Sequence, residues 1–449
     1  MSNHTYLFYD IETTGLNKCF DQVLQFAAIK TDSQLNELER HEIQVRLNAD
    51  VVPSPFAVIT HRIPISHYHQ GLSEYDAIKK IHTLLNTPNT ISIGYNSLGF
   101  DDEFLRFSFY RNLLSPYTHQ FANGCGRMDM YPIALLYFLF KKETLKWPED
   151  NLKLENINQC NQLFDGQAHN AMVDVEVTLA LAKKLAQDKT MWNFVADYFQ
   201  KNTDEMRIAS SDQIGLMVYG KIGKSLNYIA PVVYIGQHQH YKNQSLWLRL
   251  DDPELINTTE KTLSKTTKIL KKRLGEPPIF LPIKDRYLNL LSDNRKNCFD
   301  QNVIWINHHT DLLKSISAYY QHEKYPDVPE CDSDAALYRI GFSTSAEEKL
   351  FQQFHAASPE KKMSIAEQFP NSIRKIQAIR IMGRHFSDYL SDDYKKIFAD
   401  YIKSEPVDFR GEKKLTSEAA LLEIDTIEKN KIIDDEQKKL LVEFRMLLM

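Results

Sequence analysis

The first 185 residues alternate strand-type apolar runs with amphipathic helical segments, and this alternation restricts the possible fold more than any other feature of the sequence. Residues 6–10, 25–30 and 90–96 have the aromatic and apolar composition of strands. Residues 74–85 and 170–185 carry apolar side chains at helical spacing. Such a mixture is typical of one α/β domain, in which helices pack against a sheet.

The rest of the chain changes character twice. Short β-type runs over residues 214–219, 228–235 and 245–250 predict a small barrel or sheet. From about residue 328 the chain is rich in Glu, Lys, Leu, Ile and Ala with helical periodicity, which predicts an all-helical region. Residues 321–329 contain two prolines and form the expected linker. We therefore expect three domains, over residues 1–188, 195–325 and 328–449.

Composition limits the kinds of function that the protein can have and the cell compartment in which it can work. The 54 basic and 59 acidic residues leave a net charge of −5, so nucleic-acid binding would need a local basic patch. Five scattered cysteines without a Cys-x-x-Cys pair suit a reducing compartment. The longest apolar run, residues 131–140, is much shorter than the roughly 20 residues that span a bilayer, and the first residues lack a signal-peptide pattern. We expect a cytoplasmic protein without a membrane partner.

The first strand ends in two acids. Asp10 and Glu12 are separated by one residue, so in an extended strand they point to the same face about 6.6 Å apart. Two such carboxylates repel and raise one another's pKa unless cations bind between them. The pair by itself is weak evidence for a site, because strand ends are often acidic simply to stay solvated.

The second element is a group of acids that follows the strand at residues 90–96. Asp101, Asp102 and Glu103 open the next helix, and they cannot all face one site because consecutive helical residues diverge by roughly 100°. We select Asp101 because it ends the string Asn-x-x-x-Phe-Asp over residues 96–101. The alternative is that these acids only cap the helix and interact with its dipole.

The third element is a histidine followed by an acid. His169 and Asp174 are about 140° out of phase on a helix, so we expect His169 in the loop before the helix and Asp174 within it. An imidazole with a pKa near 6.5 can take a proton from water at neutral pH. The alternative is a surface histidine beside a capping turn.

These three elements together resemble, in order and spacing, the motifs of the DEDDh exonucleases, a 3′ to 5′ proofreading-type superfamily. The resemblance implies a ribonuclease-H-like fold with a mixed five-stranded sheet. Asn170 stands where a related subclass has a tyrosine base, which favours His169 as the general base. Longer strings resemble the bacterial exodeoxyribonuclease I family, over residues 26–33, 94–96, 100–103, 109–112, 147–149 and 170–172.

That family resemblance implies an exonuclease domain, an SH3-like β-containing domain and an all-helical C-terminal domain, arranged as a clamp over single-stranded DNA. The implied reaction degrades single-stranded DNA from the 3′ end to 5′-mononucleotides, in DNA repair and recombination. The implied reaction uses two Mg²⁺ ions, for which Mn²⁺ can substitute. Hard oxygen ligands suit these ions and argue against zinc. The implied metal ligands are Asp10, Glu12, Asp101 and Asp174, with His169 as the base.

Substrate contacts are also implied by the family match, at Glu12, Arg106, Tyr117, Lys153 and Tyr338. Lys153 stands where the family tends to arginine, so a bidentate phosphate contact is replaced by a point charge. Either tyrosine could instead be a partly buried core residue. We further expect a helix over residues 259–274 with four lysines on one face, namely Lys261, Lys265, Lys268 and Lys272. This face either lies along the DNA or is simply exposed to solvent.

The expected partners are single-stranded DNA and the acidic, Phe-ending C-terminal tail of single-stranded DNA-binding protein, for which the family implies a basic and apolar groove. The chain is expected to be a monomer. One alternative is a DNA-binding scaffold with a vestigial nuclease site, although the complete set of acids and His169 argues against it. The other is a 3′ to 5′ exoribonuclease like ribonuclease T or oligoribonuclease, but those are short chains and this one continues about 260 residues beyond its nuclease domain.

Overall fold

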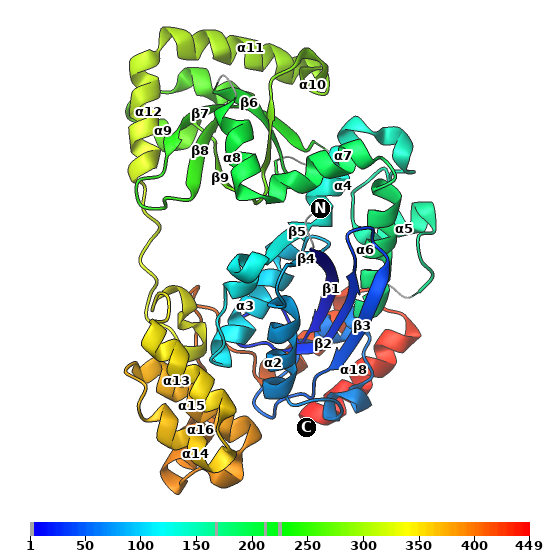
Figure 1. The fold of residues 1–449 in the computed structure, drawn as a ribbon, viewed down its shortest axis with the longest axis vertical. Helices are drawn as coiled ribbons and strands as arrows, with labels where there is room; N and C mark the ends of the chain where they lie inside the picture. Colours follow the sequence, from blue (N-terminus) through cyan, green and yellow to red (C-terminus); the bar gives the residue numbers. More distant parts are fainter. Residues whose placement is uncertain (1–3, 167–168, 211–212, 223–226) are drawn as a thin grey trace. The chain divides into compact units, whose positions relative to one another are not determined.

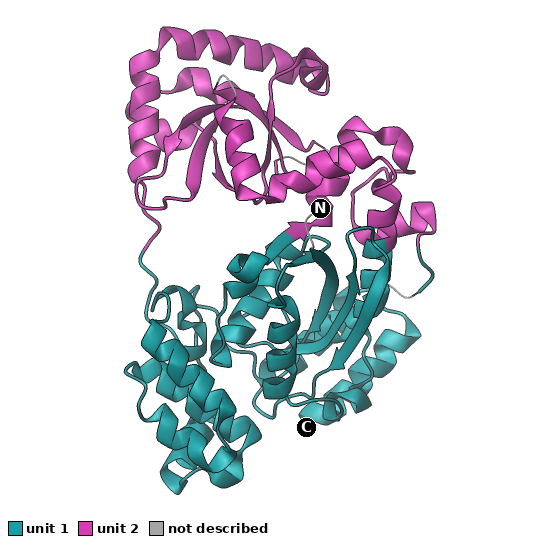
Figure 2. Cartoon of the chain, in the orientation of Figure 1, with its two compact units in different colours: residues 1–127, 164–179, 327–449 teal, residues 128–163, 180–326 magenta. Residues whose placement is uncertain are grey.

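The computed structural model describes residues 4–166, 169–210, 213–222 and 227–449 (Figure 1). The chain forms two compact units (Figure 2), of which unit 1 contains Met1–Arg127, Phe164–Leu179 and Asp327–Met449, and unit 2 contains Met128–Leu163 and Ala180–Pro326. These units divide the chain differently from the three predicted domains, whose boundaries stay a prediction. Among the described residues, no helix is both long and apolar enough to cross a membrane.

The N-terminal sheet has five strands in the order β3-β2-β1-β4-β5. Strand β1 runs antiparallel to β2 and parallel to β4, so the sheet is mixed, as the family resemblance implies. The α/β character of this part of the chain is confirmed. The strands are β1 (Thr5–Thr13), β2 (Val23–Thr31), β3 (Glu37–Gln44), β4 (Thr90–Gly94) and β5 (Gly126–Asp129).

Helices α2 (Glu74–Leu85) and α3 (Asp101–Arg111) form one core with strands β1 and β2. Leu7, Tyr9 and Ile11 of β1 are buried in this core. Because side chains alternate along a strand, Asp10 and Glu12 point to the opposite face of the sheet. The acids therefore face away from the core that holds their strand in place.

The C-terminal region of unit 1 is all helical in its regular structure, as predicted from its periodicity. Its helices are η8 (Ser333–Tyr338), α13 (Ser345–Ala356), α14 (Pro359–Ala366), α15 (Ser372–His385), η9 (Ser387–Tyr389), α16 (Asp392–Lys403), α17 (Ser417–Asn430) and α18 (Asp435–Leu448). Helices α17 and α18 share a core with β2 and with α1 (Pro55–His61). The C-terminal helices thus pack against the N-terminal sheet.

Unit 2 contains a second five-stranded antiparallel sheet in the order β10-β6-β7-β8-β9. The three predicted β runs correspond to β6 (Ile214–Val218), β7 (Ile229–Gln237) and β8 (Gln244–Arg249), and they are confirmed. The other strands are β9 (Ile269–Arg273) and β10 (Ile279–Pro282). The helices are α4 (Met130–Phe140), α5 (Leu154–Asn161), α6 (Ala171–Leu185, shared with unit 1), α7 (Lys189–Ala196), α8 (Lys201–Ala209), α9 (Leu263–Thr266), α10 (Asp285–Leu288), α11 (Asp293–His308) and α12 (Thr310–His322).

The predicted helix over residues 259–274 is wrong. Only the single turn α9 is helical there, and strand β9 follows it, paired with β8 so that Lys272 lies opposite Ser245. Lys272 is buried and its ammonium lies 2.5 Å from the carboxylate of Asp204. Pairing with a neighbouring strand therefore overrides the lysine spacing, and the four lysines do not share a solvent-facing helical surface.

Candidate active site

Strand β1 carries the first two acids. Asp10 lies opposite Ala27 of β2 and Glu12 lies opposite Gln25, and the register shifts directly after Glu12. Both acidic side chains are partly exposed. The small side chain of Ala27 leaves room above the carboxylate of Asp10, since directly opposed residues share one face of the sheet.

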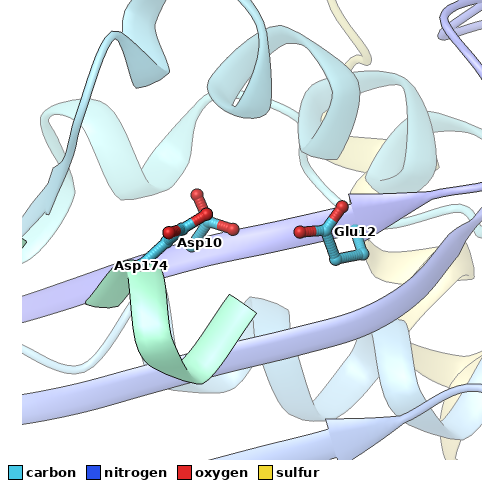
Figure 3. Close-up of side chains that lie close together, drawn as sticks. All are labelled: Asp10, Glu12 and Asp174. Atoms are coloured by element: carbon cyan, nitrogen blue, oxygen red, sulfur yellow. The ribbon is translucent and has the colours of Figure 1, made fainter. Parts of the chain in front are cut away.

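Helix α6 brings the third acid to the same place. The side-chain oxygen of Asn170 accepts hydrogen bonds from the backbone N–H groups of Met172 and Val173, at 3.2 and 3.3 Å, and so caps the helix. Asp174 lies in the first turn. One carboxylate oxygen each from Asp10, Glu12 and Asp174 lie within 4.8 Å of one another (Figure 3). Two acids of β1 thus lie beside an acid of α6 that is distant from them in the sequence.

Asp101 is not one of the three carboxylates that lie within 4.8 Å of one another, but its charge acts on two of them. Burial raises the pKa of Asp10 well above its ordinary value, and the charges of Asp101, Glu12 and Asp174 raise it further. Burial, Asp174 and Asp101 raise the pKa of Glu12 in the same way. Carboxylates this close are stabilised by protons or by bound cations. An all-oxygen, all-anionic donor set fits Mg²⁺ or Mn²⁺.

Asp102, the neighbour of Asp101, points into a different environment. Its carboxylate accepts hydrogen bonds from Arg127 at 2.6 Å, Arg106 at 2.7 Å and His119 at 3.0 Å. Burial alone would raise the pKa of Asp102, but Arg127, His119 and Arg106 hold it well below its ordinary value. Asp102 is therefore a structural ion-pair partner, which supports the choice of Asp101 for the site.

His169 lies in the exposed loop before α6, as predicted. Its backbone has a left-handed φ of 62°, and its N–H donates to the carboxylate of Asp174 at 3.2 Å. The loop that carries the imidazole is thereby tied to one of the converging acids. His169 also acts on His61, at the end of α1. The pKa of His61 is lowered to about 3, mainly by burial and secondarily by the charge of His169. Nothing in the local sequence distinguishes His61.

Three of the predicted substrate residues lie close together: Arg106 on α3, Tyr117 directly before η3 (Thr118–Gln120) and Tyr338 at the end of η8. The guanidinium of Arg106 lies 5.2 Å from the ring centre of Tyr117. The hydroxyl of Tyr338 donates to Glu103 at 2.5 Å and accepts from Arg106 at 3.3 Å. Substrate contact by these residues stays a prediction.

Lys153 belongs to unit 2, at the start of α5. It is exposed and lies 3.5 Å from the carboxylate of Glu155. Its predicted substrate contact, like that of Glu12, stays a prediction.

Comparison with known proteins agrees with this geometry. A family model described as "Exonuclease" matches residues 7–182. Exodeoxyribonuclease I of Buchnera aphidicola subsp. Baizongia pistaciae is 28% identical over 426 residues, covering 87% of this chain and 85% of that protein. Exodeoxyribonuclease I of Escherichia coli is 28% identical over 373 residues, covering 76% and 77%.

A crystal structure of E. coli exonuclease I in complex with a dA16 oligonucleotide has the same fold, with a TM-score of 0.88, 23% identity and 99% of each chain covered. The exonuclease domain, the small β-containing region and the helical C-terminal region that the sequence predicts are all present in this fold. Residues 7–182 thus match the exonuclease family model, and most of the chain is similar to exodeoxyribonuclease I.

Proposed function

We propose that this protein is an exodeoxyribonuclease that degrades single-stranded DNA in the 3′ to 5′ direction, in DNA repair and recombination. The observation that carries the proposal is the convergence of Asp10, Glu12 and Asp174 within 4.8 Å beside the loop of His169. Similarity to exodeoxyribonuclease I along most of the chain supports DNA as the substrate. A relative of the same fold was crystallised with a single-stranded oligonucleotide.

Two Mg²⁺ ions are the proposed cofactors, with Mn²⁺ able to replace them. Asp10, Glu12, Asp101 and Asp174 would hold them, because each offers hard carboxylate oxygens and the cluster needs positive charge. When bound, such ions supply a nucleophile from water and stabilise the charge that develops on the phosphate and the leaving oxygen.

The residues of the chain have separate roles in the proposed hydrolysis. His169 accepts the proton of the attacking water, whose oxygen bonds to the terminal phosphorus while the bond to the 3′ oxygen of the preceding nucleotide breaks. Asp174 keeps the His169 loop in place through the backbone N–H. Arg106 lies on the helix that begins at Asp101 and offers its guanidinium to the backbone of the strand. The product is a 5′-mononucleotide.

The experiment is degradation of end-labelled single-stranded DNA, duplex DNA and RNA with Mg²⁺ or with excess chelator. We expect mononucleotides from single-stranded DNA, released from the 3′ end, with Mg²⁺ alone. The matched control is Asp174→Asn, which should still bind the strand. Preferential cleavage of RNA would favour the exoribonuclease alternative, and binding without cleavage by the parent protein would favour the scaffold.

A groove in unit 2 is the proposed site for the tail of single-stranded DNA-binding protein. It has a volume of about 610 Å³ and combines an apolar floor with basic side chains. Arg207 lies over the rings of Phe194 and Tyr198, at 4.5 and 4.2 Å. Such a lining suits an acidic peptide that ends in Phe, since the ring can enter the apolar part while the cations meet its carboxylates. The charged residues along the groove are Lys141, Asp188, Arg207, Lys284 and Arg286.

A labelled acidic peptide ending in Phe tests this groove. We expect saturable binding that weakens when the peptide's terminal carboxylate is amidated, and when Lys284 and Arg286 are both changed to Ala. Lys314→Ala, on an exposed side chain of the same unit, is the control. Equal binding by all variants would exclude the groove. Monomeric state and location in the cytoplasm stay predictions, which sedimentation and cell fractionation test.

A further inference from the structure

Asp21 is a buried carboxylate in the loop between β1 and β2, and it has no part in the proposed hydrolysis. Its side chain accepts a hydrogen bond from the hydroxyl of Thr14 at 3.0 Å and another from the backbone N–H of Asn17 at 2.8 Å. Only 7% of the residue is exposed. Burial raises the pKa of Asp21 to about 6, and the two hydrogen bonds oppose this shift. A buried carboxylate needs donors of this kind at its oxygens.

The loop that contains Asp21 begins directly after the acids of β1. The register of β1 against β2 shifts between Glu12 and Thr13. The N–H of Thr14, the next residue, donates to the carbonyl of Gln22 at 2.9 Å, and its hydroxyl accepts from the N–H of Gln22 at 3.0 Å. The same hydroxyl donates to Asp21. Such an irregularity bends a strand and redirects the side chains beside it. The direction of the Glu12 carboxylate therefore depends on a loop that Asp21 closes.

Gly15 packs tightly against the carboxylate of Asp21. A Cβ atom on Gly15 would lie 2.4 Å from Oδ2 of Asp21, which is far inside van der Waals contact. Only glycine at this position leaves room for the backbone and the carboxylate to approach so closely. Gly15→Ala is therefore a second way to displace the same carboxylate, with Asp21 itself unchanged.

Helix α3 holds the same loop from the other side. Arg111, the last residue of α3, donates to the backbone carbonyls of Cys19 at 2.8 Å and Asp21 at 2.7 Å. The carboxylate of Glu74 on α2 accepts from Arg111 at 3.2 Å and balances its buried charge. Helix α3 begins at Asp101. The loop after β1 is thus tied to the helix that carries another proposed metal ligand at its opposite end.

We propose that Asp21 is a positioning residue for the metal site, because it holds residues 14–22 in the conformation that aims Glu12 at the site shared with Asp10 and Asp174 (Figure 3). Asp21 acts through the hydroxyl and backbone of Thr14. Carboxylates that are already aimed at one place lose less freedom when an ion binds, so metal affinity is higher. The inference rests on the proposed function, because the ions belong to the proposed hydrolysis.

The test is a calorimetric titration of the metal-free full-length protein with Mn²⁺. Asp21→Asn keeps the shape of the side chain but replaces an acceptor with an NH₂ group, which cannot accept from Asn17. Loss of a residue that orients metal ligands weakens metal binding by roughly 10- to 100-fold, and we expect this for both Asp21→Asn and Gly15→Ala. In a cleavage assay, excess Mn²⁺ should restore most of the rate, with an unchanged KM for single-stranded DNA. Asp204→Asn is the control, since it alters a buried aspartate of unit 2 that pairs with Lys272 and should keep the parent's Mn²⁺ affinity.

A milder variant covers the case in which the first two do not fold. Thr14→Val removes only the hydroxyl that donates to Asp21, and should weaken Mn²⁺ binding in the same direction by a smaller factor. Circular dichroism identifies the variants that fold. If every folded variant of this loop binds Mn²⁺ like the parent, or loses no more affinity than Asp204→Asn, the positioning role is overturned while metal-dependent cleavage by the parent still supports the nuclease. If the parent itself neither binds Mn²⁺ nor degrades single-stranded DNA, the proposed function fails and this inference with it.

Discussion

Two adjacent aspartates of α3 should respond to the same substitution in opposite ways. Asp102 is 1% exposed and accepts hydrogen bonds from Arg127, Arg106 and His119. Asp102→Asn leaves the charges of the arginines without their carboxylate inside the protein. Breaking a buried ion pair in this way costs about 3–5 kcal/mol. At roughly 2–4 °C per kcal/mol for a domain of this size, the melting temperature should fall by roughly 6–20 °C.

Asp101→Asn should leave the metal-free protein at least as stable as the parent. Its charge helps to raise the pKa of Asp10 and Glu12, so removing it relieves repulsion among the carboxylates. The same change removes a proposed metal ligand. It should abolish cleavage of single-stranded DNA and reduce the stabilisation that Mg²⁺ gives the parent.

Calorimetric melting of both variants, in chelator and in Mg²⁺, combined with a labelled-strand cleavage assay, measures all of these effects. The parent protein in the same buffers is the reference. The reasoning is refuted if Asp101→Asn melts lower than Asp102→Asn in chelator. It is equally refuted if Asp102→Asn keeps its stability and loses only its response to Mg²⁺, because Asp102 would then be the ligand.

Four further outcomes can be measured. Excess chelator should abolish cleavage and lower the melting temperature, and full activity in chelator would exclude the metal site. His169→Ala should lower turnover by roughly 10²-fold or more with little change in DNA affinity, which single-turnover kinetics and binding assays report separately. Lys272→Ala should destabilise unit 2 by about 3–5 kcal/mol, because it leaves a buried carboxylate unpaired, whereas exposed Lys265→Ala should have no measurable effect in the same denaturant titration. Burial works to raise the pKa of Asp50, but Arg384 lowers this pKa well below its ordinary value. The ionised carboxylate therefore stabilises the fold above about pH 4, and this stabilisation is lost as the pH falls further. Asp50→Asn should cost stability at pH 7, and unfolding at a series of pH values should show the difference between variant and parent shrinking towards pH 3.

Strands β1, β2, β4, β6, β7 and β8 and helices α2 and α6 could be predicted because their signals are local, whereas β3, β5, β9 and β10 were missed. The run before Asp10 has strand composition, and helix α6 shows its apolar stripe within one segment. Once a strand or helix is correctly placed, the face on which an acid lies follows from its period. The motif order then indicates which acids meet, even though Asp10 and Asp174 are far apart in the sequence.

What could not be predicted depends on partners distant in the sequence. Lys272 has the same spacing as its neighbouring lysines, and only Asp204 of another element shows that it is buried. The burial of His61 likewise depends on tertiary packing. Hydrophobic periodicity carries no information about contacts between distant residues, because it describes one segment and not the segments that pack against it.

The charge of the protein favours stacking over long-range attraction as the main source of DNA affinity. The net charge is −5, and several cations that a sequence count would offer to phosphates are instead bound to buried carboxylates, including Arg127, Lys272 and Arg384. Such cations release no counterions from DNA and add nothing to its salt-dependent binding. Exposed aromatic rings and the metal ions proposed between the acids are then groups that can hold a strand, whereas Arg106 is itself paired with buried Asp102. An enzyme built this way grips the bases and the 3′ end itself, which suits a reaction that must start at an end and repeat on any sequence.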